Sequence, residues 1–312
     1  MNHKVSLFFC YILNILGCIM KEHMKCTISD DLELQVSLYG SFSKTSFDKC
    51  PVVILHGFLD HHLSWEYIAL SIQQVGNISV VSYDQRGHGR SSHVSTSSQY
   101  HFPDYISDLY QLLESLQISK CHLVGHSMGG TVASIFAAAF PEKVVQLFLI
   151  EGLGPSHENE ILSFQRIKKH LHQRTRHVRH AIYPHFQDLC TRIQNVYPFL
   201  RTETVEKFAI YLGVEVNHEN QTGWTWRYDV RHKDANAISF HEPRHLELLT
   251  HIKSPTFLCF GRNSWYLTIP NVQNRIQKLQ SCVDIQYLDC GHNPHIECPQ
   301  ELSDWIIKHL TN

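Results

Sequence analysis

Short apolar runs alternate with amphipathic segments along most of the chain. Mainly apolar runs occupy residues 52–55, 79–83, 121–124 and 144–150. Runs of this length, bounded by polar or glycine-rich segments, are typical of strands buried on both faces of a sheet. Residues 32–39 instead alternate between apolar and polar positions, which indicates a half-exposed strand.

Two of the intervening segments have helical spacing. After Pro103 the apolar positions recur three and four residues apart as far as Leu116, and proline is well tolerated at a helix start. Residues 131–140 are rich in alanine and end before Pro141, which stops a helix. Strands alternating with helices predict an α/β fold with a mostly parallel sheet flanked by helices.

The alternation is interrupted after the fourth apolar run. The next stretch is polar, rich in histidine and helical in period, without a convincing buried strand. Strand signals return at residues 255–260 and 283–288, and a last helix is expected over residues 299–310. We therefore predict one core with a helical cap inserted in it. The predicted division is a leader or anchor at 1–24, the core at 25–155 and 235–312, and the cap at 156–234.

The leader carries a targeting signal that can be interpreted in several ways. Lys4 precedes an apolar run from Val5 to Met20, which is short for a membrane-spanning helix but fits the core of a signal peptide. Its residues 15–18 weakly resemble a bacterial lipoprotein cleavage box. A short uncleaved anchor, or an extension upstream of a start at Met20 or Met24, are the alternatives. Membrane association through residues 5–20 therefore stays open.

Composition adds limits on partners and cofactors. Among the 312 residues, the net charge of −2 excludes a globally basic nucleic-acid binder. The 24 histidines and 10 cysteines suggest metal or disulfide chemistry, but both residue types are scattered and no CxxC pair occurs. We expect reduced thiols, no metal and no organic cofactor. Reduced thiols favour the cytoplasm, whereas the leader favours a membrane-anchored or exported protein.

Candidate chemistry concentrates at residues 125–129, Gly-His-Ser-Met-Gly, directly after a predicted strand and before a helix. A serine on such a sharp turn projects its hydroxyl above the sheet, and the flanking glycines, extended by Gly130, let neighbouring elements approach closely. This context predicts Ser127 as a nucleophile.

A serine nucleophile needs a base to take its proton. The loop after the last predicted strand, residues 290–295, reads Cys-Gly-His-Asn-Pro-His. We predict His292 as the base, with His295 as the alternative.

With these motifs in place, the chain from about residue 26 resembles the serine hydrolases of the α/β-hydrolase fold superfamily. The resemblance is carried by residues 56–58, 84–91, 125–130 and 291–292. Within the superfamily, residues 149–155 and 223–227 resemble a bacterial group related to the animal "serine hydrolase-like" proteins.

The resemblance leaves the third member of the catalytic triad open. In most relatives an Asp follows the strand that corresponds to residues 256–260, but this chain has Ser264 there. Some relatives carry the acid one strand earlier, and Glu151 matches that position after the run 144–150. We predict Glu151 as the acid; Asp289, Asp60 or no acid at all are the alternatives.

The resemblance also implies an oxyanion hole made of two backbone amides. These belong to Met128, after the nucleophile, and to Phe58, in the loop after His56 and Gly57. We expect His56 to position that loop, and the turn at residues 86–90 to be structural.

The expected activity is hydrolysis of carboxylic esters or thioesters of small to medium acids, through an acyl-enzyme on Ser127. Hydrolysis of carbon–carbon bonds or lactones is an alternative, and so is a non-catalytic ligand-binding protein on the same fold. The expected partner is a small-molecule acyl substrate, with no nucleic acid.

Two features of the cap have open interpretations. The basic segment 168–180 fits either a solvated helix face or contact with an anionic substrate or membrane surface. Trp224 and Trp226 fit either an acyl pocket or an anchor of the cap.

Overall fold

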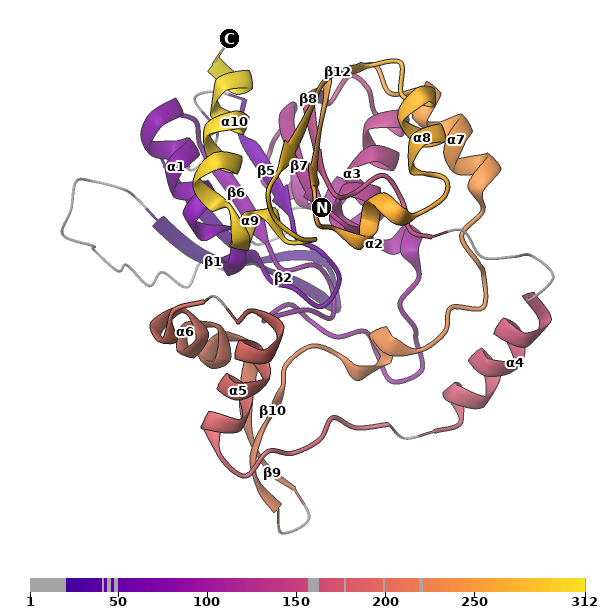
Figure 1. Ribbon diagram of the computed structural model, residues 1–312. Coiled ribbons are helices and arrows are strands. Elements are labelled where there is room, and N and C mark those ends of the chain that lie inside the picture. Colours follow the sequence, from indigo (N-terminus) through magenta and orange to yellow (C-terminus); the bar gives the residue numbers. More distant parts are fainter. Residues whose placement is uncertain are drawn as a thin grey trace.

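A mixed sheet of eight strands forms the centre of the molecule in the computed structural model (Figure 1). The structure describes residues 21–40, 42–43, 46–47, 50–156, 163–176, 178–198, 200–218 and 221–311. In sheet order, the strands are β1 (Lys21–Ser29), β2 (Leu32–Tyr39), β6 (Val80–Tyr83), β5 (Val52–Leu55), β7 (Cys121–His126), β8 (Val144–Ile150), β11 (Thr256–Gly261) and β12 (Cys282–Leu288).

The predicted, mostly parallel sheet is confirmed. Strand β2 pairs antiparallel with both β1 and β6, whereas β6, β5, β7, β8, β11 and β12 run parallel to one another. The parallel strands β5, β6 and β11 are buried along their whole length. This burial explains their unbroken apolar sequences, because helices cover both faces of the sheet.

Two groups of helices supply that cover (Figure 1). On one face lie α1 (Glu66–Gly76) and α10 (Pro299–Thr311), whose apolar side chains share a core with β5 and β8. The other face is covered by α2 (Phe102–Ser115), α3 (Met128–Ala139), α7 (Glu242–Thr250) and α8 (Val272–Lys278). Shorter elements are β3 (Phe42–Ser43), β4 (Ser46–Phe47), η1 (His62–Trp65), η3 (Val230–Lys233), η4 (Trp265–Thr268) and α9 (Pro294–Glu297).

The sheet begins earlier than the predicted boundary between leader and core. Residues 21–24, placed in the leader by the sequence, belong to β1, in which Met24 pairs with Val36. The reason is the alternation of Met24, Cys26 and Ile28, which are all buried against the core. The apolar run 5–20 lies outside the described residues. Within the described residues, no helix has the length and apolar character needed to cross a membrane.

The interval predicted as a helical cap contains helices but also a β-hairpin. Its helices are α4 (Ser163–Arg174), α5 (Phe186–Val196) and α6 (Thr202–Leu212). They are followed by β9 (Gly213–His218) and β10 (Gln221–Trp226), which pair antiparallel. The sequence predicted no buried strand here, and most described residues of this hairpin are exposed or half-buried, but the hairpin itself was not predicted. The apolar signal of the hairpin is limited to alternate positions such as Trp224 and Trp226, which is too short to stand out against its polar neighbours.

The two tryptophans of β10 pack within this region. The ring of Trp224 lies 4.9 Å from Phe186 of α5, and Trp226 lies 6.3 Å from Tyr183. Both pack against the apolar cluster that α5 and α6 form. Trp226 also lines a pocket together with His180 and Tyr228. The tryptophans therefore anchor the hairpin to the cap helices, and one of them also borders a cavity.

Candidate active site

Ser127 lies on a strained turn between β7 and α3. Its backbone has φ 49° and ψ −114°. Residues other than glycine rarely adopt such a positive φ. The surrounding glycines leave no room for a side chain: a Cβ on Gly129 would lie 2.4 Å from the carbonyl oxygen of Leu55, and one on Gly130 would lie 2.7 Å from Gly152 Cα. Close packing against β5 and the end of β8 therefore fixes the turn that presents the serine.

His292 lies in the loop after β12 and connects two of the other predicted residues. Its Nε2 atom lies 3.1 Å from Ser127 Oγ, and its Nδ1 atom lies 2.9 Å from Glu151 Oε2. The rings of Trp265 and Tyr266 lie 4.6 and 5.9 Å from the imidazole. The structure thus brings Ser127, His292 and Glu151 into one chain of hydrogen bonds.

Glu151 follows β8 directly and is fully buried. Its backbone also has a positive φ, of 53°. The backbone N–H of Gly261, at the end of β11, donates to Oε1 at 2.6 Å. The hydroxyl of Ser264 donates to Oε2, the oxygen that also contacts the His292 ring. A buried carboxylate requires such partners, and here the neighbouring strand and its loop provide them.

The part played by Ser264 is the main feature that sequence reasoning missed. In the sequence, Ser264 only stands where most relatives have the Asp of the triad. In the structure, its hydroxyl donates to the carboxylate of Glu151 and also accepts the backbone N–H of Tyr266 at 3.1 Å. Glu151 follows β8 and Ser264 follows β11, and the sequence alone does not reveal that these are neighbouring parallel strands. Carboxyl ends of such strands meet at one edge.

The other carboxylates that the sequence left open have different partners. Asp60 Oδ2 lies 3.2 Å from Nε2 of His295, and Asp289 Oδ1 accepts from the side chain of Asn263 at 3.1 Å. The alternative base, His295, is buried beneath the site and stacks on Trp65 with ring centroids 4.5 Å apart.

The loop that contains Phe58 passes close to the nucleophile. A Cβ on Gly57 would lie 3.4 Å from Ser127 Cβ, so the neighbouring backbone borders the site. His56 holds this loop: its Nδ1–H donates to the carbonyl oxygen of Gly57 at 2.7 Å, while its Nε2 accepts the N–H of Gln85 at 3.0 Å. Met128 is the first residue of α3, where backbone amides have no partner within the helix. The amide of Met128 thus adjoins Ser127 in the chain, and the loop that contains Phe58 borders the site.

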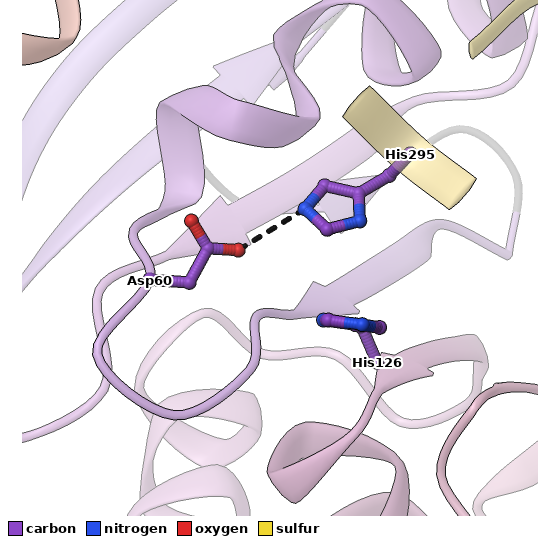
Figure 2. A group of neighbouring side chains, drawn as sticks. All are labelled: Asp60, His126 and His295. Atoms are coloured by element: carbon purple, nitrogen blue, oxygen red, sulfur yellow. Dashed lines mark hydrogen bonds and ion pairs between the residues drawn. The ribbon is translucent and has the colours of Figure 1, made fainter. Parts of the chain in front are cut away.

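Three side chains below this site could hold a metal ion. Figure 2 shows Asp60, His126 and His295 pointing toward one another, and each offers a ligand atom within 4.8 Å of the others. Hydrogen bonds already occupy part of this donor set. His295 contacts Asp60, and the Nε2–H of His126 donates to the carbonyl oxygen of His292 at 2.8 Å. In this arrangement the group supports the loop that carries His292.

Burial governs protonation in this group. Burial lowers the pKa of His126 well below its usual value, and the nearby rings of His295 and His292 lower it further. For Asp60, burial opposes ionisation, but the hydrogen bond from His295 holds the pKa well below its usual range. A neutral His126 and an ionised Asp60 follow at neutral pH.

The turn at residues 86–90 is held by interactions inside the protein. Arg86 pairs with Asp108 and Asp104, which belong to α2. A Cβ on Gly89, whose φ is 50°, would lie 2.1 Å from the carboxylate of Asp84. These contacts fit the structural role expected of this turn.

Asp84 belongs to a second hydrogen-bonded chain that resembles the first. Its Oδ1 atom lies 2.9 Å from Nδ1 of His62, and Nε2 of His62 lies 2.8 Å from Ser37 Oγ. All three residues are fully buried or nearly so. This arrangement could not be predicted from the sequence, because Ser37, His62 and Asp84 lie in three separate segments.

The serine on a strand-to-helix turn of a mostly parallel sheet defines a class of hydrolases. A model of the α/β hydrolase fold family matches residues 51–299. The chain therefore belongs to the α/β-hydrolase fold family, and it is a serine hydrolase of that superfamily, as its sequence motifs predicted.

The chain is similar to proteins that are named as lipases and serine hydrolase-like proteins. The sn-1-specific diacylglycerol lipase ABHD11 of Danio rerio is 30% identical over 268 residues, which cover 84% of this chain and 79% of that protein. The serine hydrolase-like protein of D. rerio is 26% identical over 273 residues, covering 83% and 81%. Among solved structures, the thioesterase domain from the curacin biosynthetic pathway superposes with a TM-score of 0.79 at 22% identity, covering 94% and 99%.

Proposed function

We propose that this hydrolase cleaves carboxylic esters or thioesters through an acyl-enzyme on Ser127. The observation that carries the proposal is the position of the His292 ring between Ser127 Oγ and Glu151 Oε2, at 3.1 and 2.9 Å. A base that contacts both the nucleophile and an orienting carboxylate is the arrangement that activates a serine hydroxyl.

The reaction has two balanced halves. In the first, His292 Nε2 takes the proton of Ser127 as Oγ attacks the acyl carbon, and the imidazolium then gives that proton to the departing alcohol or thiol. In the second, water attacks the acyl-enzyme, His292 takes a proton from the water, and Ser127 leaves as the protonated hydroxyl. The amides of Met128 and Phe58 are proposed to stabilise the oxyanion in both halves, where loss of one donor costs about 3 kcal/mol in other serine hydrolases.

Glu151 is proposed to hold the ring of His292 in the correct tautomer. Its ionised form stabilises the imidazolium, while the donors from Gly261 and Ser264 keep the carboxylate in place. This support from a buried carboxylate favours catalysis over ligand binding without chemistry. Relatives named as a diacylglycerol lipase, a monoacylglycerol lipase and a thioesterase support acyl transfer to water as the reaction class.

Labelling with a fluorophosphonate probe tests the nucleophile. We expect the wild type to be labelled and Ser127→Ala to lose both labelling and turnover of a panel of p-nitrophenyl esters and acyl thioesters. Ser37→Ala is the matched control, because that serine also contacts a histidine but is buried. Its variant should keep full labelling.

Two results would contradict the proposal. Labelling that survives in Ser127→Ala would remove Ser127 as the nucleophile. Turnover of lactones or of carbon–carbon bonds of β-diketones, with no turnover of esters or thioesters, would replace the proposed substrate class by the alternative one.

A further inference from the structure

Helix α4 has its polar side turned toward the protein and its apolar side turned toward solvent. Helices of globular proteins normally do the opposite, because burial of the apolar face stabilises them. No residue of Ser163–Arg174 is buried. In Figure 1, α4 stands apart from the layered sheet and helices.

The side of α4 that faces the protein is held by polar contacts. Arg166 donates to the carbonyl oxygen of Asn236 at 3.1 Å. One turn further on, His170 Nδ1 lies 2.8 Å from the carbonyl oxygen of Ala235. Gln173 then accepts the backbone N–H of Ala235 at 2.8 Å. These contacts fix which side of the helix faces outward.

The outward side carries a stripe of large apolar residues. Phe164, Ile167 and Leu171 are spaced three and four residues apart, so they share one face of the helix. Their exposed fractions are 65%, 46% and 58%. An exposed apolar stripe of this kind is typical of a surface that binds another protein or a membrane.

The charges around the stripe are all of one sign. The segment Ser163–Arg174 contains four Lys and Arg residues and no Asp or Glu, in a chain whose net charge is −2. Lys168 is exposed beside the stripe, on the side of Phe164, whereas Lys169 is exposed on the opposite side of the helix, and Arg176 follows the helix. An apolar stripe with a cation at its border and no acidic residue in its helix complements an anionic lipid surface, where acyl chains receive the stripe and headgroups pair with Lys168.

We propose that α4 is an interfacial helix that docks this protein onto an anionic lipid surface. Phe164, Ile167 and Leu171 enter the boundary between headgroups and acyl chains, while Lys168 contacts the headgroups. The hydrogen bonds of Arg166, His170 and Gln173 to residues 235–236 hold α4 to the rest of the protein, which then lies on the side of the helix away from the lipid. A second copy of the chain fits this face poorly, because two such stripes would bring like charges together. This docking does not depend on the chemistry at Ser127.

Hydrogen exchange of the full chain locates the docking. The protein is mixed with vesicles of pure phosphatidylcholine or of equal parts phosphatidylcholine and phosphatidylglycerol. We expect slower exchange in peptides that cover residues 163–174 with the anionic vesicles only. Because the measurement is local, binding through residues 5–20 does not produce this signal.

Substitutions in the stripe then test its contribution. Phe164→Gln, Ile167→Gln and Leu171→Gln together should weaken vesicle binding by about tenfold or more and abolish the local protection. The matched control is Val75→Gln, Val196→Gln and Ile210→Gln, which changes three exposed apolar residues of other helices and should leave both unchanged. Ser127→Ala should dock like the wild type, which separates this proposal from the proposed hydrolysis.

The charge requirement has its own pair of variants. Lys168→Glu should weaken binding to anionic vesicles about tenfold, since a basic residue near such a surface contributes about 1 kcal/mol and the glutamate is repelled. Lys169→Glu makes the same change in net charge on the opposite side of the same helix and should have little effect.

Several outcomes would overturn the proposal: no protection of residues 163–174 with anionic vesicles, equal protection with neutral ones, or unchanged binding in the Lys168→Glu variant. Sedimentation showing a dimer that the three stripe substitutions dissociate would also overturn it, since the stripe would then be a contact between copies.

Discussion

Two Ser–His–carboxylate chains of nearly the same dimensions occur at different places in this hydrolase. In one, His292 contacts Ser127 at 3.1 Å and Glu151 at 2.9 Å. In the other, His62 contacts Ser37 at 2.8 Å and Asp84 at 2.9 Å. By hydrogen-bond geometry alone, the second chain is the better one.

Their surroundings differ in every respect that matters for chemistry. Ser37 lies within β2 and is fully buried, and its hydroxyl also contacts Nδ1 of His23 at 2.6 Å. Ser127 lies on a strained turn, beside the first amides of α3 and the loop of Phe58. Of the two serines, only Ser127 is partly exposed and adjoins the first backbone amides of a helix, which are donors of the kind that an oxyanion requires.

The buried chain instead connects parts of the structure. Asp84 accepts the backbone N–H groups of His62 and Arg90, and the hydroxyl of Tyr211 from α6 donates to it. It therefore joins β2, the end of β6 and the cap. The comparison shows that a triad must be identified by its access and its oxyanion donors, not by its distances.

Removal of the carboxylate in each chain should separate the two roles, and the largest effect is expected at Glu151. Glu151→Gln should lower kcat by roughly 10⁴-fold, because the amide cannot stabilise the imidazolium. The measurement is steady-state hydrolysis of the best ester of the panel. Turnover within tenfold of the wild type would show that another group is the acid.

Asp84→Asn should affect stability and leave the chemistry intact. Loss of one partner of a buried pair costs about 3–5 kcal/mol, so the free energy of unfolding in urea should fall by about that amount. The kcat of the folded enzyme should stay within a few-fold. Asp289→Asn, at an exposed carboxylate, is the control and should change stability by less than about 0.5 kcal/mol. A large loss of kcat in folded Asp84→Asn would contradict this prediction, because it would show that the buried chain also contributes to catalysis.

Buried histidines outside both chains make stability depend on pH. Burial lowers the pKa of His61, His232 and His245 to about 4. Because the unfolded chain takes up these protons near pH 6.5, the stabilising effect of keeping the rings neutral is complete above that pH and is lost as the pH falls toward 4.

Between pH 6 and 5 the three rings together should lower the free energy of unfolding by about 3 kcal/mol. Urea unfolding at each pH measures this slope. His245→Gln should reduce the loss of stability between pH 6 and 5 by about 1 kcal/mol, and an unchanged loss would mean that the pKa of this ring is not lowered in the folded protein.

The smallest expected effect concerns the support of the active carboxylate. Ser264→Ala removes the hydroxyl that donates to Glu151 and should lower kcat about tenfold, with little change in KM. Ser264→Thr keeps the hydroxyl and should retain most of the activity. A normal kcat in Ser264→Ala would show that the amide of Gly261 alone suffices to hold the carboxylate.

Much of the architecture is readable from the sequence, because fully buried parallel strands leave unbroken apolar runs and Ser127 lies between a strand and a helix in a glycine-rich motif. The same pattern of apolar runs predicts that two separate segments of the chain form the core, with the cap inserted between them. The sequence does not predict the β9–β10 hairpin. Its two strands pair with each other, and they are too short to show a clear alternation of apolar and polar residues. The early start of β1 was missed because its alternation merges with the apolar leader.

The contacts of the site were harder to predict than its residues. Ser264 resembles a defect in the sequence, and only the register of β8 against β11 reveals that its hydroxyl reaches Glu151. The roles of His126 and of the Asp60–His295 pair depend likewise on contacts between distant segments. Such contacts are properties of three-dimensional packing, which residue types and spacing do not specify.

Because Glu151 follows β8, the carboxylate and the groups that hold it come from two different segments of the chain. Because the carboxylate comes from the end of β8, the loop after β11 has to supply only a hydroxyl and one amide. Its next residue, Trp265, is 57% exposed and lies beside the His292 ring. Exchange of Trp265 would therefore leave in place the hydroxyl and the amide that hold Glu151, so this position beside the His292 ring can vary in sequence without loss of the contacts of the carboxylate.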